Sequence, residues 1–403
     1  MANKNSPIIL AFSGGLDTSF CVPWLKETYG KPVITVTVDT GGINKETSKH
    51  LKEHSKKLGA NDHILVNAKD DFFNDVLKFL IMGNIKKGNM YPLCVGSERV
   101  IQAKYLAKIA KDMHSDTVAH GCTAAGNDQI RFQIILKSLA PDLKILAPVR
   151  DQSWARDDQV SYLKKLGLPT PKSGSTYSIN RGLWGVTIGG SETLDSKETI
   201  PESSWELSPN VFPSSSKNEQ KIIIEFKKGI PIKINGEDLN PIQIIEKLET
   251  TGKVFGIGRG IHLGDTILGI KGRVAFEAPA AEILINAHRE LEKLTLSSLQ
   301  LKIKEQLSLH YCELIHEGKQ LDPACNDIES FFMSSQKYVS GKVDCVLRPG
   351  SVFITGIKSP FSLMSASKSK YGESIGEWDA RDALGFSRIL SLPGTLHSRV
   401  KES

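Results

Sequence analysis

The chain has 403 residues, of which 40% are hydrophobic and 24% are charged, and its formal net charge at pH 7 is only +6. This is the composition of an ordinary globular protein with two or three domains, and so mild a charge suits anionic small molecules without demanding nucleic acid. No run of about 18 apolar residues occurs and residues 1–5 lack the apolar core of a secretory signal, so we expect a cytoplasmic protein that does not cross a membrane. The six cysteines show no CxxC spacing, which favours free thiols over a zinc site or a disulfide framework.

The first distinctive feature is a short apolar run, residues 7–12, that leads directly into Ser13-Gly14-Gly15-Leu16-Asp17-Thr18-Ser19. The pattern predicts a strand, a tight turn and the start of a helix whose backbone N–H groups point at an anion. The glycines allow positive φ and close approach of a phosphate, while Thr18 and Ser19 offer hydroxyls or a helix cap. We predict a polyphosphate cradle, with an ordinary glycine turn before a capped helix as the alternative. Pro23 predicts a kink or a late helix start.

This loop also lacks a residue that many phosphate loops contain. A Walker-type loop has Gly-Lys-Ser/Thr, whose lysine reaches the phosphate being transferred, and no lysine occurs between Ser13 and Ser19. Phosphoryl transfer is therefore not the favoured chemistry. The loop resembles that of the N-type ATP pyrophosphatases, in which it holds the departing pyrophosphate while a substrate oxygen attacks the α-phosphorus to form an adenylate.

Up to about residue 168, β-rich runs alternate with helical patterns, which predicts an α/β domain with a parallel sheet wrapped by helices. Ligands of such sheets bind beyond the carboxyl ends of the strands. Asp39-Thr40-Gly41-Gly42 follows the second strand at that edge, where it either lies beside the adenosine of a nucleotide or is a plain turn. The predicted strands cover residues 7–12, 32–38, 63–67, 117–120 and 144–147, with helices over 71–80 and 98–111.

The pattern changes after a Pro/Gly/Ser-rich linker at residues 168–175. Strands are then clustered apart from helices, which predicts an α+β domain. The tail of the chain begins with a polar stretch rich in Lys and Ser at residues 365–372, so we expect residues 365–403 to form a loosely attached arm. We therefore predict a nucleotide-binding domain over 1–168, a second domain over 175–364 and a C-terminal arm over 365–403. Within the second domain we predict hairpins over 221–234 and 339–357 and helices over 241–249, 280–294 and 299–316.

A second polar group follows the strand predicted at residues 117–120. Small residues from Gly121 to Gly126 allow close approach of a ligand, and Asn127, Asp128 and Arg131 then supply an amide, a carboxylate and a guanidinium within one helical turn. Such a turn is suited to gripping a carboxylate and a reacting amine. A helix capped by Asn127 is the alternative.

Together with the first loop, these residues resemble the argininosuccinate synthase family, and the resemblance extends over nearly the whole chain. Other adenylating members of the superfamily share only the first loop, so the combined pattern is specific. The matching segments are residues 126–132 (GNDQIRF), 177–185 (YSINRGLWG), 256–259 (GIGR), 271–273 (KGR) and 276–279 (FEAP).

The resemblance implies a two-step ligase that uses ATP and Mg²⁺. The ureido oxygen of citrulline attacks the α-phosphorus of ATP, and the amine of L-aspartate then displaces AMP to give argininosuccinate, as in arginine biosynthesis. The nucleophiles belong to the substrates, so the enzyme positions groups and neutralises charge without covalent catalysis. Asp17, Asp128 and Arg99 are the candidate positioning residues, with helix capping as the alternative for Asp17 and an exposed helix position as the alternative for Arg99.

The resemblance also assigns binding residues by position. For ATP these are Ala11, Phe12, Ser13, Gly14, Gly15, Leu16, Asp17, Thr18, Ser19, Val38 and Gly121. For aspartate they are Thr123, Asn127 and Asp128. For citrulline they are Tyr91, Asn127, Arg131, Ser178 and Thr187.

Several family positions differ in this chain, mostly at the citrulline end. Where the family has small hydroxyl residues, this chain has Cys94-Val95-Gly96. A family glutamate is replaced by Gly264 and a family tyrosine by Phe276. The turn at residues 123–126 lacks the family's lysine, and Gln133 stands where the family has a glutamate. A substrate ammonium buried without a carboxylate is costly. Either Asp265 or Glu192 replaces the missing partner, or the ureido substrate is an N-acylated citrulline whose α-nitrogen carries no charge.

Two other functions remain open at this stage. A tRNA-modifying adenylase uses the same phosphate loop, but neither paired reactive cysteines nor a concentrated basic surface is visible, and we expect no nucleic-acid partner. The second open function is a nucleotide sensor, which binds a nucleotide without catalysing a reaction. The resemblance further implies a homotetramer in which the C-terminal arm crosses to neighbouring copies.

Overall fold

The computed structural model describes residues 6–170, 177–214 and 219–402. Its N-terminal part is built on a five-stranded parallel sheet in the order β3-β2-β1-β4-β5, which confirms the predicted α/β architecture. All five predicted strands form. They are β1 (Ile8–Ala11), β2 (Val33–Asp39), β3 (Asp62–Asn67), β4 (Thr117–Ala119) and β5 (Lys144–Leu146).

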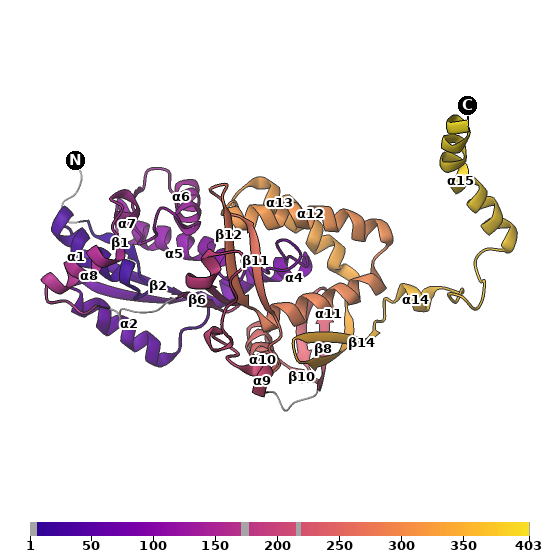
Figure 1. Ribbon diagram of the computed structural model, residues 1–403, viewed down its shortest axis with the longest axis horizontal. Helices are drawn as coiled ribbons and strands as arrows, with labels where there is room; N and C mark the ends of the chain where they lie inside the picture. The colour runs from indigo at the N-terminus through magenta and orange to yellow at the C-terminus, as the bar shows by residue number, and fades with distance from the viewer. Residues whose placement is uncertain (1–5, 171–176, 215–218, 403) are drawn as a thin grey trace.

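Helices cover both faces of this sheet (Figure 1). Because side chains alternate along a strand, Ile8 and Leu10 pack in one hydrophobic cluster with α1 and α8, while Ile9 packs in another with α5 and α6. The helices are α1 (Leu16–Tyr29), α2 (Lys45–Lys57), α5 (Arg99–Asp112), α6 (Asp128–Leu139), α7 (Pro148–Asp151) and α8 (Arg156–Lys165).

Two helical predictions need adjustment. Helix α1 begins directly after the glycine turn and continues through Pro23, so a late helix start is wrong. The helix predicted over 71–80 is longer and contains one turn of π-helix: it comprises α3 (Lys69–Phe72), η1 (Phe73–Leu77) and α4 (Lys78–Met82).

The second part contains two antiparallel sheets, in the orders β10-β9-β8-β13-β14 and β11-β12-β7-β6. The first includes both predicted hairpins: β8 (Gln220–Lys227) with β9 (Ile230–Ile234), and β13 (Gly341–Arg348) with β14 (Ser351–Lys358), beside β10 (Glu237–Asp238). The second sheet was not predicted. It comprises β6 (Ser178–Gly182), β7 (Gly185–Gly189), β11 (Arg259–Asp265) and β12 (Lys271–Glu277).

Helices complete the second part, and the predicted ones form with extended ends. They are α10 (Pro241–Lys253), α11 (Pro279–Thr295), α12 (Ser298–Glu317) and α13 (Pro323–Ser335). The largest hydrophobic cluster runs from Ile9 of β1 to Leu347 of β13, so the two parts share one core. Most of the predicted linker, residues 171–175, lies outside the described residues.

The unpredicted sheet brings the second part against the first. Leu183, in the turn between β6 and β7, donates its backbone N–H to the carbonyl oxygen of Thr40 at 3.3 Å. Gly41 has φ of +120°, and a Cβ there would meet the backbone of Leu183 at 2.6 Å, so only glycine fits this contact. The β6–β7 hairpin therefore closes over the carboxyl edge of the parallel sheet.

Beyond β14 the chain leaves the body of the molecule. Helix α14 (Leu363–Ala366) still lies against α11, whereas α15 (Ala380–Glu402) projects away from the body (Figure 1), and neither helix contains a buried residue. Among the described helices, none is both long enough and apolar enough to cross a membrane.

Candidate active site

The loop between β1 and α1 presents a helix start to the carboxyl edge of the sheet. Gly14 has φ of +77°, and the side chain of Ser13 accepts a hydrogen bond from the N–H of Gly15 at 3.4 Å. The Thr18 hydroxyl lies 3.2 Å from Ser13 Oγ and 3.2 Å from the carbonyl oxygen of Gly15. Neither Thr18 nor Ser19 caps α1, because its cap residue is Gly15 and no side chain bonds to its first turn. The backbone N–H groups of the first turn of α1 are therefore available to a ligand.

A cavity of about 640 Å³ opens in front of this loop. It contains most of the residues that the sequence assigns to ATP: Ala11, Phe12, Ser13, Gly15, Asp17, Thr18, Val38 and Gly121. The other three, Gly14, Leu16 and Ser19, shape the turn and do not line the cavity. Thr40 and Gly41 also line it, as do the predicted aspartate residues Thr123, Asn127 and Asp128. The phosphate loop and the second polar group thus face one cavity.

Close approach of two loops sets the shape of this cavity. A Cβ on Gly121 would lie 3.0 Å from the backbone of Asp17 and Thr18, so glycine at this position lets the loop after β4 touch the phosphate loop. Behind the loop, Ser19 Oγ is 2.8 Å from Nε2 of the buried His54 on α2, a contact that the sequence did not reveal. Asp17 Oδ1 is buried and has no hydrogen-bond partner among the described residues.

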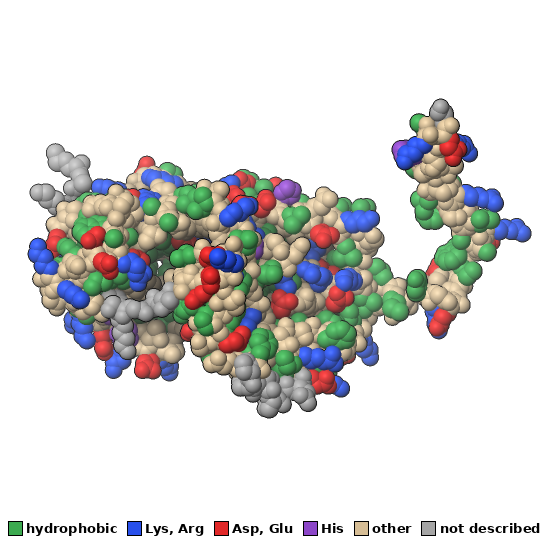
Figure 2. Space-filling model, viewed as in Figure 1, with side chains coloured by type: hydrophobic (Ala, Val, Ile, Leu, Met, Phe, Trp, Pro, Cys, Tyr) green, Lys and Arg blue, Asp and Glu red, His purple; other side chains and the backbone are tan. Residues whose placement is uncertain are grey.

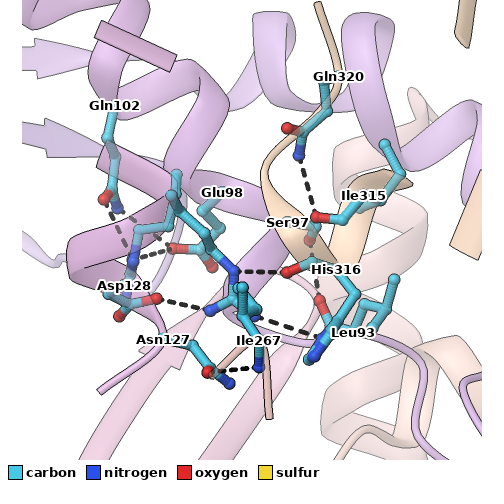
Figure 3. A network of polar contacts seen from close by, with 12 residues as sticks. Leu93, Ser97, Glu98, Gln102, Asn127, Asp128, Ile267, Ile315, His316 and Gln320 are labelled. Atoms are coloured by element: carbon cyan, nitrogen blue, oxygen red, sulfur yellow. Dashed lines mark hydrogen bonds and ion pairs between the residues drawn. The ribbon is translucent and has the colours of Figure 1, made fainter. Parts of the chain in front are cut away.

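A charged network occupies the far wall of the cavity. Asp128 Oδ2 accepts a hydrogen bond from Arg99 Nη2 at 2.8 Å, and its Oδ1 accepts one from Arg131 Nη1 at 2.7 Å (Figure 3). Asn127 occupies the N-cap position of α6, but its side chain does not bond to the helix: it accepts the N–H of Ile267, in the β11–β12 turn, at 3.0 Å. Arg99 is buried, so the exposed helix position considered from the sequence is wrong.

The two arginines determine the electrostatics of Asp128. Burial alone would raise the pKa of Asp128, but Arg99 and Arg131 outweigh burial and hold it well below its ordinary value. Burial likewise opposes the charged form of Arg99 and lowers its pKa. The attraction of the Asp128 carboxylate outweighs burial, so the pKa of Arg99 is raised. Asp128 and Arg99 are therefore both charged at neutral pH.

Glu98 is a site residue that the sequence did not reveal. It is 2% exposed, lines the cavity and accepts a hydrogen bond from Thr40 Oγ1 at 2.8 Å through Oε2, while Oε1 has no partner in the part of the chain that the structure describes. Burial raises the pKa of Glu98 to about 8, against the opposing effects of Arg99 and Thr40. Glu98 is thus mostly protonated at neutral pH, which limits the charge that Arg99 must balance.

A smaller chamber of about 220 Å³ adjoins the main cavity and shares Arg99, Asn127, Asp128 and Arg131 with it. Tyr91 and Thr187, two of the predicted citrulline residues, line this chamber. The ring of Tyr91 stacks on the ring of His262, with 5.7 Å between the ring centroids, and its centroid lies 5.2 Å from that of Phe276. Ser178 lines the main cavity instead, at the start of β6.

Arg131 also connects the chamber to α12. Its Nε donates to the carbonyl oxygen of His316 at 2.8 Å, and its Nη2 lies 3.3 Å from Nδ1 of the same histidine. His316 is buried and lines the chamber. Burial, followed by Arg131 and Lys87, lowers the pKa of His316 to about 3, so the imidazole is neutral.

The two acids that the sequence offered as replacement partners for a substrate ammonium are both engaged. Asp265 Oδ1 lies 2.5 Å from Lys271 Nζ, and its side chain is 65% exposed. Glu192 accepts a hydrogen bond from the hydroxyl of Tyr177 and does not line the chamber.

Comparisons with known proteins agree with this arrangement. Two family models match the chain: the arginosuccinate synthase N-terminal HUP domain over residues 7–169, and the arginosuccinate synthase C-terminal domain over residues 177–397. The chain is 36% identical over 394 residues to an argininosuccinate synthase of Methanocaldococcus jannaschii, covering 98% of both chains. It is 37% identical over 399 residues to one of Dictyoglomus thermophilum, again covering 98% of both.

Proposed function

Because this chain belongs to the argininosuccinate synthase family, we propose that it is an ATP-dependent ligase that joins the ureido carbon of citrulline to the amine of L-aspartate, releasing AMP and pyrophosphate. One observation carries the proposal: the phosphate loop and the Asp128 network line a single cavity. A ligase of this kind needs the α-phosphorus and both substrates within one enclosed space.

In the first step, the start of α1 holds the β- and γ-phosphates and leaves the α-phosphorus open to the ureido oxygen of citrulline. The bond from α-phosphorus to the bridging oxygen breaks, and pyrophosphate leaves with that electron pair. The N–H groups of the loop stabilise the charge that develops on the leaving group. Val38 and Ala11, at the ends of neighbouring strands, provide an apolar edge for the adenosine.

In the second step, the amine of aspartate attacks the ureido carbon, and AMP leaves with the former ureido oxygen. We assign the orientation of that amine to Asp128; the position of its carboxylate at the cavity wall between two guanidinium groups supports this assignment. Thr123 and Asn127 complete the aspartate subsite at the same turn. Arg99 and Arg131 balance the substrate carboxylates, and Tyr91, Ser178 and Thr187 surround the citrulline.

The residues fit a magnesium ion that arrives on ATP. No cluster of three or more metal-binding side chains exists among the described residues, so a resident ion is not favoured there. Asp17 Oδ1, buried beside the phosphate loop without a partner, suits a magnesium-bound phosphate group. The ion would neutralise charge on the phosphates, and Asp17 would orient it from the first turn of α1.

We further propose that residues 1–168 bind the nucleotide, residues 175–364 complete the substrate site and residues 365–403 form an arm that crosses to neighbouring copies in a homotetramer. The structure of helix α15 supports the proposed role of the arm: the helix is amphipathic, has no buried residue and projects from the body (Figure 2). Its exposed apolar side chains include Leu384, Phe386, Ile389, Leu390, Leu392, Leu396 and Val400.

The test is pyrophosphate release from ATP, measured with each substrate omitted in turn and with AMP and ADP separated chromatographically. We expect AMP, and full turnover only when the ureido substrate and aspartate are both present. Formation of ADP would contradict the proposal. A salt-sensitive shift of tRNA on a gel without substrate-dependent AMP formation would instead favour a tRNA-modifying adenylase, and nucleotide binding without turnover would favour a sensor.

A further inference from the structure

The smaller chamber contains hydrogen-bond donors and cations but no free carboxylate. Of the residues that line it, only Asp128 and Asp265 are acidic. Asp128 already accepts from Arg99 and Arg131, and the proposed function requires it for the amine of aspartate. The segments outside the described residues contain no Asp or Glu, so none of them supplies an acid.

The strand register keeps the carboxylate of Asp265 away from the chamber. Residues directly opposite one another on neighbouring strands share a face, and residues alternate faces along a strand. Gly264 is opposite Gly272 and lies on the same face as His262, whereas Asp265 is opposite Lys271 on the other face and forms an ion pair with it. The imidazole of His262 fills the space beside Gly264, where a Cβ would lie 2.6 Å from Nε2.

His316 adds a neutral donor to the chamber. A guanidinium has no acceptor, so His316 Nδ1 must accept from Arg131 Nη2, and the proton of the neutral ring is therefore on Nε2. That Nε2 is buried, and among the described residues no partner lies at hydrogen-bond distance from it; the backbone of Asp265 is near enough to the imidazole to raise its pKa, against the larger effect of burial. The Nε2–H group can donate to a carbonyl oxygen, but it offers nothing to an ammonium group.

The remaining wall of the chamber is apolar and aromatic. Tyr91 and His262 stack on one another, Phe276 packs against Tyr91 from behind, and Val274 lines the space beside them. These apolar and aromatic side chains suit a small acyl group.

We propose that the ureido substrate of this ligase is an N-acylated citrulline, whose amide-linked α-nitrogen is uncharged and whose acyl carbonyl accepts a hydrogen bond from His316 Nε2. This inference rests on the proposed function, because the reacting ureido group and aspartate are the same. The product is then the N-acylated argininosuccinate, and the balance of AMP and pyrophosphate is unchanged.

The first experiment compares N-acetyl-L-citrulline with L-citrulline as substrates of the full-length protein, at saturating ATP and aspartate. We expect kcat/KM for N-acetylcitrulline to exceed that for citrulline at least ten-fold. Equal values, or a preference for citrulline, would overturn the inference while leaving the proposed function intact. No AMP formation with either compound would remove the proposed function and this inference with it.

Variants distinguish the charge argument from a general effect on folding. Combining His262→Ala with Gly264→Glu places a carboxylate on the chamber face, and we expect it to shift the substrate ratio at least ten-fold toward citrulline relative to His262→Ala alone. Asp265→Ala should leave the ratio of the wild type unchanged. A selective loss of citrulline use in Asp265→Ala would show that Asp265 binds a substrate ammonium, and would refute the inference. Thermal unfolding of each variant checks that the fold is retained.

Discussion

Arg99 donates from Nη2 to Oδ2 of Asp128 at 2.8 Å, which joins the first turn of α5 to the first turn of α6. Arg131, one turn further along α6, occupies the other carboxylate oxygen at 2.7 Å. Three charges from two helices are thus fixed before any substrate arrives. For the reaction proposed above, such preorganisation favours catalysis, because the site need not reorganise when charge develops.

Asp128→Asn tests this network. The amide keeps the shape of the side chain but removes the charge that holds both arginines, so we expect kcat/KM for aspartate to fall at least 100-fold. The free energy of unfolding should fall by about 1–3 kcal/mol at pH 7, less than for a fully enclosed pair, because the Asp128 side chain is 32% exposed.

The pH dependence gives a second readout for Asp128. Its pKa is lower in the folded chain than its ordinary value of 3.8, so its contribution to stability is complete above that value and is lost as pH falls toward the folded pKa. Urea unfolding at pH 3, 5 and 7 should show the same gap between wild type and Asp128→Asn at pH 5 and pH 7, and a gap that begins to narrow at pH 3. Asp75→Asn, which breaks an exposed pair with Lys104, is the control and should cost less than about 1 kcal/mol.

Glu98→Gln should alter stability in the opposite pH range. The folded carboxyl keeps its proton up to about pH 8, whereas the unfolded one loses it near 4.5, so wild-type stability falls as pH rises between these values. Glutamine does not titrate. We expect Glu98→Gln to gain a few kcal/mol relative to wild type between pH 5 and pH 8, since one pKa unit corresponds to about 1.4 kcal/mol. A difference in urea unfolding that stays constant from pH 5 to pH 8 would contradict the raised pKa.

The sequence predicted the parallel sheet and its phosphate loop because both are encoded locally. A short β-rich run, two glycines and hydroxyl residues define β1 and the start of α1 without reference to distant residues. The family resemblance then identified segments of the second part, yet the sheet that they form was missed. Strands β6 and β7 contain glycine and polar residues, and their hairpin is joined to the sheet through the pairing of β7 with β12 from far along the chain.

The site residues that were missed share a related cause. Glu98 lies between Ser97 and Arg99, and His316 lies between Ile315 and Glu317, and an ionisable residue in either position is normally exposed. Their burial depends on contacts across the fold, with Thr40 for Glu98 and with Arg131 for His316. The one local signal was Arg99 directly after Glu98, a charge pair at a helix start that local sequence cannot distinguish from a surface pair.

Asp17→Asn distinguishes a magnesium role from helix stabilisation. If Asp17 orients a magnesium-bound phosphate, the variant should need at least ten-fold more Mg²⁺ for half-maximal AMP formation, with a much smaller loss of kcat at saturating Mg²⁺. If Asp17 only stabilises the first turn of α1, the unfolding free energy should fall by about 0.3–1 kcal/mol with no change in the Mg²⁺ requirement. The measurement is a Mg²⁺ titration at fixed ATP, paired with urea unfolding of the same variant.

Removal of the arm, residues 365–403, should reduce the assembly without unfolding the body. Helix α15 carries apolar side chains such as Ile389, Leu396 and Phe386 that are at least half exposed in the single chain, and burying them against another copy would stabilise an oligomer. Light scattering after gel filtration should therefore report four copies for the full chain and fewer after truncation. Ile389→Asp combined with Leu396→Asp should have the same effect, whereas Arg388→Ala, which leaves those side chains in place, should not. A truncated chain that keeps the mass of four copies would show that contacts on the body hold the assembly together.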